Sequence, residues 1–441
     1  MLIRFAVNGI YSFGQMEEFN MLPSKSSKRM TSHKYNICGL SILKMAAIYG
    51  ANGAGKSNLV KSLLVLKEIL LKGKLPANNN LGYRLGLNRN EVIQQLAIEF
   101  IEDDIPYIYS LEFKDGVILS EDLYRSGLGK IDKFIFERKE INGETQLTFS
   151  EELEKDAKIE ALKGVLEESL LEQNKSALSF MAGLKKVPLD DLTKVIAWFN
   201  RLILISPSSK PKSLAHNVDV DAGFKSYAEG IMCSFHVGII QLRTEKKLIH
   251  DYFGSELPKN ISEATKRKDV KMINITNSSG VELDMVKEGD DFMVKELLLS
   301  HENVKNEPVD FSLNEESDGT RRMLELIPAF KDAVDHKAVV VVDEIERSMH
   351  PLLIKELIKK FSEDDDTSGQ LIFTTHESQL LDQKIFRADE IWFAEKNQGS
   401  TKLYSLSKFK EHSSIDIRKG YLNGRYGSIP FLGNLKDLNW H

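Results

Sequence analysis

Hydrophobic and polar residues follow two different patterns along the chain. In residues 2–22 and 95–137 apolar side chains alternate with polar ones over short runs, which predicts β-strands. Residues 151–199 carry leucines at helical spacing among many charges and predict helices, and a second helical section is expected over 221–250. Further strand-like runs are found at 271–276 and 292–299. The pattern predicts a β-rich layer, a helical middle and a second part that contains strands.

The first strong motif lies between an apolar run at 42–49, which has the character of a buried strand, and a leucine-rich helical run at 58–72. Between them the sequence reads G-x-x-x-x-G-K-S. In this pattern the glycines let successive backbone N–H groups turn toward phosphate oxygens, Lys56 reaches the β- and γ-phosphates, and the Ser57 hydroxyl ligates magnesium. The motif predicts a site for ATP and Mg²⁺ formed by Gly50, Ala51, Asn52, Gly53, Ala54, Gly55, Lys56, Ser57 and Asn58.

Two further apolar runs end at residues that suit the same chemistry. Residues 338–342 form an apolar strand that stops at Asp343 and Glu344. We expect Asp343 to lie beside the magnesium and Glu344 to polarise the water that attacks the γ-phosphate. The run at 371–375 ends at His376, whose neutral imidazole is expected to hydrogen-bond the γ-phosphate. The predicted catalytic residues are Glu344, His376 and Lys56, and the predicted metal ligands are Ser57 and Asp343.

A polar turn at 313–322 leads into an apolar helix at 323–330. Ser317 is expected to cap this helix, and the N–H groups around Gly319 direct the positive end of the helix dipole outward. Taken alone, the turn is also consistent with an ordinary capped helix. Its position between the phosphate-binding loop and the acidic strand favours an anion site.

Composition limits the class of protein. The chain has 441 residues, of which 42% are hydrophobic and 28% charged, as in a soluble protein of two or three packed units. A net charge of -6 argues against a protein that coats nucleic acid, so any DNA contact must be local. The two cysteines form neither a disulfide framework nor a zinc motif, and no run reaches the roughly 18 apolar residues of a membrane span. We expect a cytoplasmic protein that is not anchored to a membrane.

The order of these motifs resembles that of ABC-type ATPase heads. The turn Glu-Ser-Asp-Gly-Thr at 316–320 differs from the Leu-Ser-Gly-Gly-Gln of transporters and is similar to that of the OLD family and related phage-defence ATPases. The stretch at 343–351 resembles their Walker B motif and D-loop. The stretch at 421–431 resembles the closing segment of stand-alone members, such as the RloA type and the AriA ATPase of the PARIS defence system. The resemblance covers 1–115 and 270–435 well and the helical middle poorly.

This resemblance implies an oligomer in which the signature turn of one subunit closes over the nucleotide of another. Ser317 and Gly319 of the signature, and Ser348 of the D-loop, would then complete the nucleotide site at the subunit interface. The resemblance further implies an anti-phage sensor and scaffold that restrains a separate effector protein until a phage trigger arrives. Because OLD nucleases carry a Toprim domain and this chain ends soon after its ATPase motifs, the expected effector is a separate Toprim nuclease.

Other motifs leave alternatives open. Gln94 and Gln95 are candidates for the Q-loop glutamine of ABC-type heads. Arg243 and His250 fit the R-x6-H spacing of HEPN-type ribonucleases, although such pairs recur by chance in charged helical regions. The acidic run at 364–366 is expected to be a solvated loop. The alternative function is a RecF-like or SMC-like DNA-maintenance ATPase, against which the lack of a long coiled coil and the acidic charge both count.

The sequence as a whole predicts an α/β fold of the ABC-type P-loop ATPase head, with a mixed or antiparallel β layer and a helical insertion. Residues 1–145 are expected to form an ATPase lobe with the P-loop and the β layer. Residues 146–265 are expected to form a mostly helical insertion, and residues 266–441 a lobe that carries the signature, the Walker B strand and the switch histidine.

Overall fold

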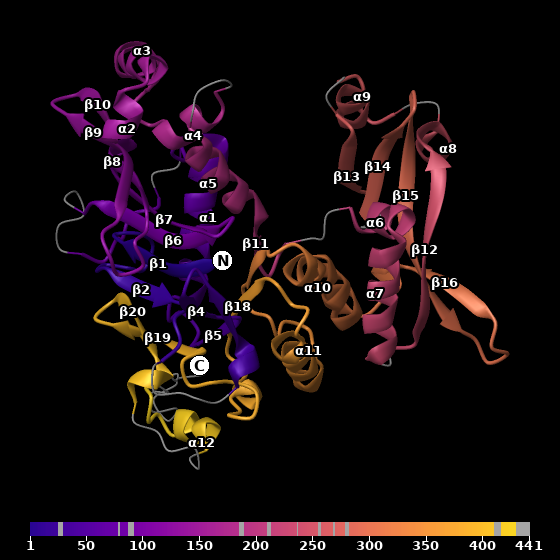
Figure 1. The fold of residues 1–441 in the computed structure, drawn as a ribbon. Helices are drawn as coiled ribbons and strands as arrows, with labels where there is room; N and C mark the ends of the chain where they lie inside the picture. The colour runs from indigo at the N-terminus through magenta and orange to yellow at the C-terminus, as the bar shows by residue number, and fades with distance from the viewer. Residues whose placement is uncertain are drawn as a thin grey trace, which may run out of the picture. The chain divides into compact units, whose positions relative to one another are not determined.

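A computed structural model describes residues 1–24, 30–77, 80–86, 92–184, 189–209, 213–235, 237–254, 257–267, 270–277, 282–409 and 416–428. The chain divides into two compact units (Figure 1). Unit 1 comprises Met1–Pro207, Ala333–Ile345 and Lys355–His441, and unit 2 comprises Ser208–Asp332 and Glu346–Ile354. These units do not follow the boundaries expected at 145 and 265. The expected helical insertion is divided, because its first part packs with the helix that follows the P-loop and its second part packs on a separate sheet.

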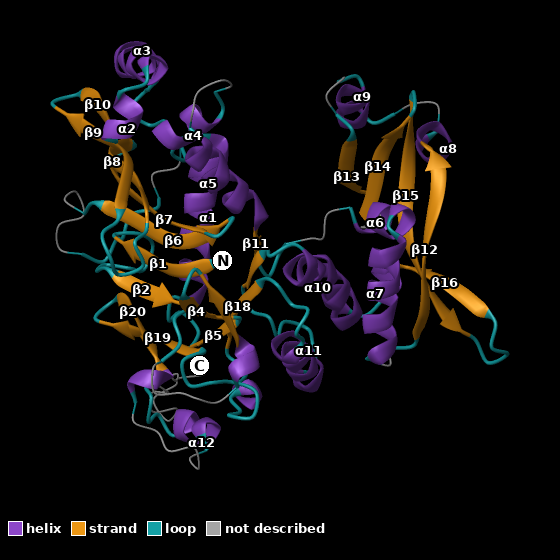
Figure 2. Cartoon of the chain, viewed as in Figure 1, coloured by secondary structure: helices purple, strands orange, loops and turns teal. Residues whose placement is uncertain are grey.

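The P-loop strand lies inside a six-stranded sheet of unit 1 (Figure 2). The strand order is β11 (Leu202–Ile205), β17 (Val339–Val342), β18 (Gln370–Thr375), β5 (Met45–Tyr49), β19 (Ile391–Asn397) and β20 (Ser400–Ser405). The first five strands are parallel, and β20 returns antiparallel to β19. β17, β18 and β5 are buried along their whole length, which explains their largely apolar sequences. Parallel strands share a carboxyl edge, so the segments that follow these three strands emerge side by side.

An antiparallel sheet of seven strands forms a second layer of unit 1. The strand order is β10 (Glu144–Phe149), β9 (Lys133–Ile141), β8 (Val117–Arg125), β7 (Ile105–Lys114), β6 (Gln94–Glu102), β1 (Leu2–Asn8) and β2 (Glu17–Asn20). Ile3, Phe5 and Val7 of β1 are buried while Arg4 is exposed, so the predicted alternation is confirmed. A hairpin of β3 (Lys34–Ile37) and β4 (Leu40–Leu43) forms a small sheet of its own.

Helices fill the core of unit 1 between and beside these sheets. They are α1 (Lys56–Lys72), α2 (Glu151–Glu154), α3 (Ala157–Val165), α4 (Ala177–Ala182), α5 (Asp190–Arg201), the later part of α11 (Pro351–Glu363) and α12 (Ile417–Leu422). α1 contacts β1 of one sheet and β11 of the other, so its leucines join the two layers in one core. α5 stacks Trp198 on Phe100 of β6, with ring centroids 4.4 Å apart. The helical prediction for 151–199 is confirmed, as several short helices.

Unit 2 is built on a separate antiparallel sheet. The strand order is β12 (Ile239–Leu248), β15 (Asp291–Glu302), β14 (Glu282–Glu288) and β13 (Met272–Thr276), and β16 (Pro308–Ser312) also pairs with β15. Its helices are α6 (Leu214–Val220), α7 (Ala222–Ser234), α8 (Ile249–Phe253), α9 (Lys259–Thr265) and most of α10 (Asp318–Asp335). The helix predicted over 221–250 is therefore wrong in its second half. There the charged sequence forms β12, because a full-length ladder with β15 outweighs its local helical pattern.

None of the helices in the described parts of the chain combines the length and the apolar character that crossing a membrane requires.

Candidate nucleotide-binding site

The P-loop joins β5 to α1 at the carboxyl edge of the six-stranded sheet. α1 begins at Lys56 directly after Gly55, and no side chain caps its first turn. Gly55 has a φ of 107°, a conformation that residues with a Cβ rarely adopt. The first N–H groups of α1 thus lack a side-chain cap and suit an anion, which agrees with the phosphate-binding role predicted for the loop.

The predicted phosphate-binding lysine lies folded against its own loop. Lys56 is almost fully buried, and its Nζ donates hydrogen bonds to the carbonyl oxygens of Gly50 at 2.7 Å and Ala51 at 3.2 Å. A phosphate oxygen is a stronger acceptor for an ammonium group than these neutral carbonyls, because both partners are then charged. Lys56 therefore lies next to the loop, and a bound phosphate is expected to replace these carbonyl oxygens as its hydrogen-bond acceptor.

The structure brings the two predicted metal ligands together. The Ser57 hydroxyl donates to Asp343 Oδ1 at 3.1 Å, although 286 residues separate them in sequence. The Thr374 hydroxyl, from β18, donates to the same carboxylate oxygen at 2.5 Å and so fixes its position. One hydroxyl and one carboxylate are hard oxygen ligands of the kind that Mg²⁺ takes, usually with water and phosphate oxygens completing the shell. The residues present fit the predicted metal site.

Thr374 is a site residue that the motif analysis did not identify. It is fully buried, and besides Asp343 it accepts a hydrogen bond from the backbone N–H of Glu344 at 2.8 Å. The available signal was a pair of hydroxyl residues inside an otherwise apolar strand, where a buried threonine needs polar partners. Its position links the two neighbouring strands that carry the predicted acid and histidine.

The predicted catalytic carboxylate has an unusual backbone. Glu344 directly follows Asp343, is half-buried, and has a φ of 53°, in the left-handed region. Such a conformation costs a residue with a Cβ about 1–3 kcal/mol and persists only where the surroundings impose it. Here the hydrogen bond from its N–H to Thr374 helps to impose it. Strained non-glycine residues cluster at functional sites, which agrees with a catalytic role for Glu344.

His376 directly follows β18, which lies between β17 and β5. Its side chain is exposed, and it emerges at the same sheet edge as Asp343 and the P-loop. This placement agrees with a residue that faces bound nucleotide. Its role as a sensor of the γ-phosphate stays a prediction.

The signature turn and the D-loop meet within unit 2. The Ser317 hydroxyl accepts a hydrogen bond from the N–H of Thr320 at 3.1 Å, so the predicted cap of α10 is confirmed. A Cβ on Gly319 would lie 2.8 Å from the carbonyl oxygen of Ser348, so only glycine allows these two backbones to approach so closely. Ser348 is exposed and has a φ of 61°. The structure therefore brings together the three residues predicted to act at a subunit interface.

Comparison with protein families adds to this geometry. The family described as "AAA domain, putative AbiEii toxin, Type IV TA system" matches residues 45–180 and 201–382, which is more than half of the chain. The chain belongs to this AAA family. Family membership and the assembled P-loop site together confirm the predicted class, an α/β P-loop ATPase. No curated protein matches the chain.

Solved structures similar to this AAA protein include three heads of SMC proteins. The SMC head bound to the C-winged helix domain of ScpA has 12% identity and a TM-score of 0.44, covering 92% of this chain and 97% of that one. The SMC head domain from Thermotoga maritima has 11% identity and a TM-score of 0.37, covering 92% and 98%. The SMC head with an extended coiled coil from Pyrococcus furiosus, bound to the C-terminal domain of ScpA, has 12% identity and a TM-score of 0.38, covering 96% and 98%.

The two Q-loop candidates of this AAA protein are engaged inside the antiparallel sheet. The side-chain amide of Gln95 donates to Glu112 at 2.6 Å and its oxygen accepts from Asn8 at 2.7 Å. Gln94 donates to the carbonyl oxygen of Val92 at 3.1 Å. These contacts give both glutamines a role in the sheet, and no Q-loop residue is assigned.

The remaining candidate motifs are not assembled into sites. Arg243 lies on β12 and forms an ion pair with Asp310 at 2.7 Å, whereas His250 lies on α8 beyond the end of the strand. An extended chain advances about 3.3 Å per residue, so the two side chains of the suggested ribonuclease pair do not meet. Asp364, at the C-terminal end of α11, pairs with the exposed Lys360, as expected of a solvated loop. Among the described residues, no group of three or more acids, histidines or cysteines could hold a metal ion.

Proposed function

We propose that the protein binds and hydrolyses ATP with Mg²⁺, and that it works in the cytoplasm as an oligomeric sensor and scaffold of an anti-phage defence system. The observation that supports the ATPase part most strongly is the contact between Ser57 and Asp343. This hydrogen bond of 3.1 Å joins the P-loop to the acidic strand, as a nucleotide site built from both would require. The family match independently supports this chemistry.

In the proposed reaction each predicted residue has a separate task. Lys56 exchanges the carbonyl oxygens of Gly50 and Ala51 for phosphate oxygens, and the uncapped start of α1 adds N–H donors to them. Glu344 accepts a proton from the water whose oxygen attacks the γ-phosphorus, and the bond from phosphorus to the β–γ bridging oxygen breaks. Mg²⁺, when bound by Ser57 and Asp343, supplies positive charge to the phosphates. His376 hydrogen-bonds the γ-phosphate and responds to its loss.

The proposed working form is a dimer or larger homo-oligomer with nucleotide at the subunit interface. Ser317 and Gly319 would face the nucleotide of a neighbouring subunit, and Ser348 would lie at the same interface. The close packing of Gly319 on the Ser348 carbonyl supports this, since it places the signature and the D-loop side by side. ATP binding would then stabilise the closed oligomer and hydrolysis would release it.

The proposed output is control of a second protein. By resemblance to the OLD-like defence ATPases the partner would be a Toprim-type nuclease on a separate chain, held inactive until a phage protein or nucleic acid arrives. The description of the matched family, which names a toxin and a toxin–antitoxin system, supports a role in controlling a toxic activity. Local contact with DNA is compatible with this role, although the net charge of -6 makes it a secondary one.

The deciding experiment is affinity purification of the wild-type protein and its Glu344→Gln and Lys56→Ala variants from the native host, each with ATP. We expect Glu344→Gln to retain nucleotide and to trap a closed oligomer that co-purifies with a nuclease-like or toxin-like chain. Lys56→Ala serves as the matched control, because it should lose nucleotide and the closed oligomer together.

The outcomes separate the two functions that the sequence suggested. A bare dimer that retains DNA, with no second protein, would contradict the defence role and favour a RecF-like or SMC-like maintenance ATPase. A wild-type protein that neither binds nor hydrolyses ATP would contradict both.

A further inference from the structure

Two hydroxyl residues from distant parts of the chain meet behind the P-loop. Ser12 lies in the turn between β1 and β2, and Thr401 lies in β20. The Thr401 hydroxyl lies 2.7 Å from the Ser12 hydroxyl and 2.9 Å from the carbonyl oxygen of Ala54 in the P-loop. The side-chain amide of Asn58, in the first turn of α1, donates to Ser12 Oγ at 2.8 Å. All four residues belong to unit 1, and no motif singled out Ser12 or Thr401.

The direction of these hydrogen bonds follows from the chemistry of the groups. The Ala54 carbonyl only accepts, so the Thr401 hydroxyl donates to it. The same hydroxyl also donates to Ser12 Oγ, which accepts from the Asn58 amide as well. The result is a hydrogen-bonded chain that joins Asn58, Ser12, Thr401 and Ala54. Since Thr401 is fully buried and Ser12 nearly so, water does not readily replace either hydroxyl.

This chain sets the orientation of one peptide of the P-loop. In a trans peptide the C=O of one residue and the N–H of the next point in opposite directions. Because Thr401 holds the Ala54 carbonyl, the N–H of Gly55 points away from Thr401. A Cβ on Gly55 would lie 2.0 Å from Thr401 Oγ1, so the threonine packs directly against this peptide. Gly55 has the left-handed φ of 107° and precedes Lys56, so the direction of its N–H bears on how the loop receives phosphate.

We propose that Thr401 and Ser12 are positioning residues that orient the Ala54–Gly55 peptide of the P-loop for phosphate binding. The inference rests on the ATP-binding function proposed above. Neither hydroxyl touches the phosphates: both act through the backbone. The chain also gives β20, near the C-terminal end of the protein, a direct connection to the nucleotide site, because Thr401 is part of that strand.

The test is the affinity for ATP of Thr401→Val, measured with a fluorescent ATP analogue by titration and competition with ATP. Valine keeps the shape of the side chain and removes the hydroxyl. Thr367→Val is the matched control: Thr367 is also buried and donates to a helix carbonyl, that of Phe361, but it lies before β18, at the opposite edge of the sheet. Melting temperatures of both variants report the structural cost of losing one buried hydroxyl.

We expect Thr401→Val to bind ATP about fivefold to tenfold more weakly, the size of effect that one lost hydrogen bond produces. Thr401→Ser should restore the affinity, and Ser12→Ala, which removes the middle of the chain, should weaken binding about twofold to fivefold. Thr367→Val should lower the melting temperature to a similar extent without any loss of affinity.

The results that overturn the inference are distinct from those that overturn the proposed function. If wild type binds ATP and Thr401→Val binds as tightly as Thr367→Val, the positioning role is wrong while the ATPase proposal stands. If Thr401→Val does not fold, Ser12→Ala decides, and an unchanged affinity in that variant refutes the role. If wild type itself binds no ATP, the proposed function fails and the inference fails with it.

Discussion

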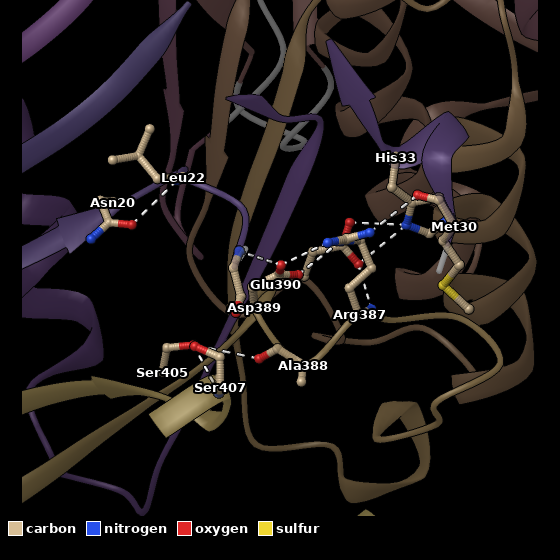
Figure 3. Close-up of polar contacts among 11 residues, drawn as sticks. Asn20, Leu22, Met30, His33, Arg387, Ala388, Asp389, Glu390, Ser405 and Ser407 are labelled. Atoms are coloured by element: carbon tan, nitrogen blue, oxygen red, sulfur yellow. Dashed lines mark hydrogen bonds and ion pairs between the residues drawn. The ribbon is translucent and has the colours of Figure 1, made fainter. Parts of the chain in front are cut away.

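The two edges of the six-stranded sheet carry charged residues that are arranged in opposite ways. At the amino edge Arg387 binds Asp389 through two hydrogen bonds of 2.8 and 2.7 Å, and His33 Nδ1 lies 2.9 Å from Glu390 Oε1 (Figure 3). These four side chains are buried and paired with one another. At the carboxyl edge the charged residues instead surround an uncapped helix start, and Glu344 is only half-buried.

This difference separates charges that hold the fold from charges that are available to a ligand. The Asp389 carboxylate also accepts the backbone N–H of Ser24 at 2.7 Å. Arg387 donates to the Met30 carbonyl (Figure 3), so the amino-edge cluster holds the backbone at these two residues. A buried ion pair of this kind adds little net stability but is costly to break. At the carboxyl edge Lys56 donates to two neutral carbonyl oxygens, which a phosphate outcompetes.

The largest expected effect is on turnover at the carboxyl edge. Glu344→Gln removes the proposed proton acceptor and should lower the rate of ATP hydrolysis by about 10²–10⁴-fold, the usual contribution of a general base. ATP affinity should be kept, since the phosphate donors are unchanged. Phosphate release in single-turnover experiments measures the rate. Glu390→Gln is the same chemical change at the amino edge, and a comparable loss of turnover in that variant would break the distinction between the two edges.

The next effect is on stability at the amino edge. Arg387→Ala leaves the buried Asp389 carboxylate without its guanidinium and should destabilise the protein by about 3–5 kcal/mol. The ATP affinity of the remaining folded molecules should not change. Urea unfolding followed by tryptophan fluorescence measures the first quantity, and nucleotide titration at low denaturant measures the second. Lys56→Ala should show the reverse pattern, with lost binding and a nearly unchanged unfolding curve.

Thr374→Val sharpens the comparison, because the Thr374 hydroxyl is expected both to stabilise the fold and to position the residues of the nucleotide site. Its hydroxyl bonds the charged Asp343 and the N–H of Glu344 inside the sheet. Hydrogen bonds to charged groups contribute about 1.5–3 kcal/mol, so the variant should lose that much stability together with much of its Mg²⁺-dependent turnover. Thr374→Ser should recover both. A variant that lost stability but hydrolysed ATP normally would show that Asp343 needs no fixed position.

The two edges also differ in how well the sequence predicts them. The P-loop, Asp343 and His376 could be predicted because each belongs to a short motif that follows an apolar run. The fold class was predicted from the same motifs together with the resemblance of their order to that of ABC-type ATPase heads. The amino-edge cluster could not be predicted, since His33 and Glu390 are 357 residues apart and neither belongs to a motif.

The other wrong predictions have the same cause: contacts between segments that are distant in sequence decide the local structure. The sequence around Arg243 has a helical pattern, but pairing with β15 makes it a strand, and this long-range choice also separates the suggested Arg243–His250 pair. The partners of Thr374, Ser12 and Thr401 were identified only from the structure, because they lie on segments that are distant in sequence. Residues that act by positioning others carry no chemical signature of their own, so their prediction requires the fold.

A smaller effect is expected on the pH dependence of stability, through the buried carboxyl of Glu390 at the amino edge. Burial raises the pKa of Glu390 above its ordinary value of 4.5, and its contacts with His33 and the Arg387 amide oppose this shift only in part. The folded protein then keeps a proton that the unfolded chain has released. The associated stability is fully present below pH 4.5 and is lost as the pH rises through the raised pKa.

Glu390→Gln, which does not titrate, tests this directly. Its free energy of unfolding relative to wild type should improve as the pH rises through that window, and urea unfolding between pH 4 and 8 measures the difference. If the free energies of unfolding of wild type and variant stay parallel across this pH range, burial does not raise the pKa of Glu390.

The smallest effect is expected at the acids that follow α11, among which Asp364 is half-buried; they lie near the amino edge but outside the buried cluster. Lys360 pairs with Asp364 at 2.6 Å with the lysine side chain 78% exposed, and exposed helix pairs contribute no more than about 0.5 kcal/mol. Asp364→Asn should therefore leave unfolding and ATP turnover nearly unchanged, since its oxygen still accepts the N–H of Asp366. DNA and RNA cleavage assays on the same variant complete the test. If the purified protein cleaves nucleic acid and Asp364→Asn abolishes that activity, the acidic run is a catalytic site, and charged residues near the amino edge act on a ligand as well.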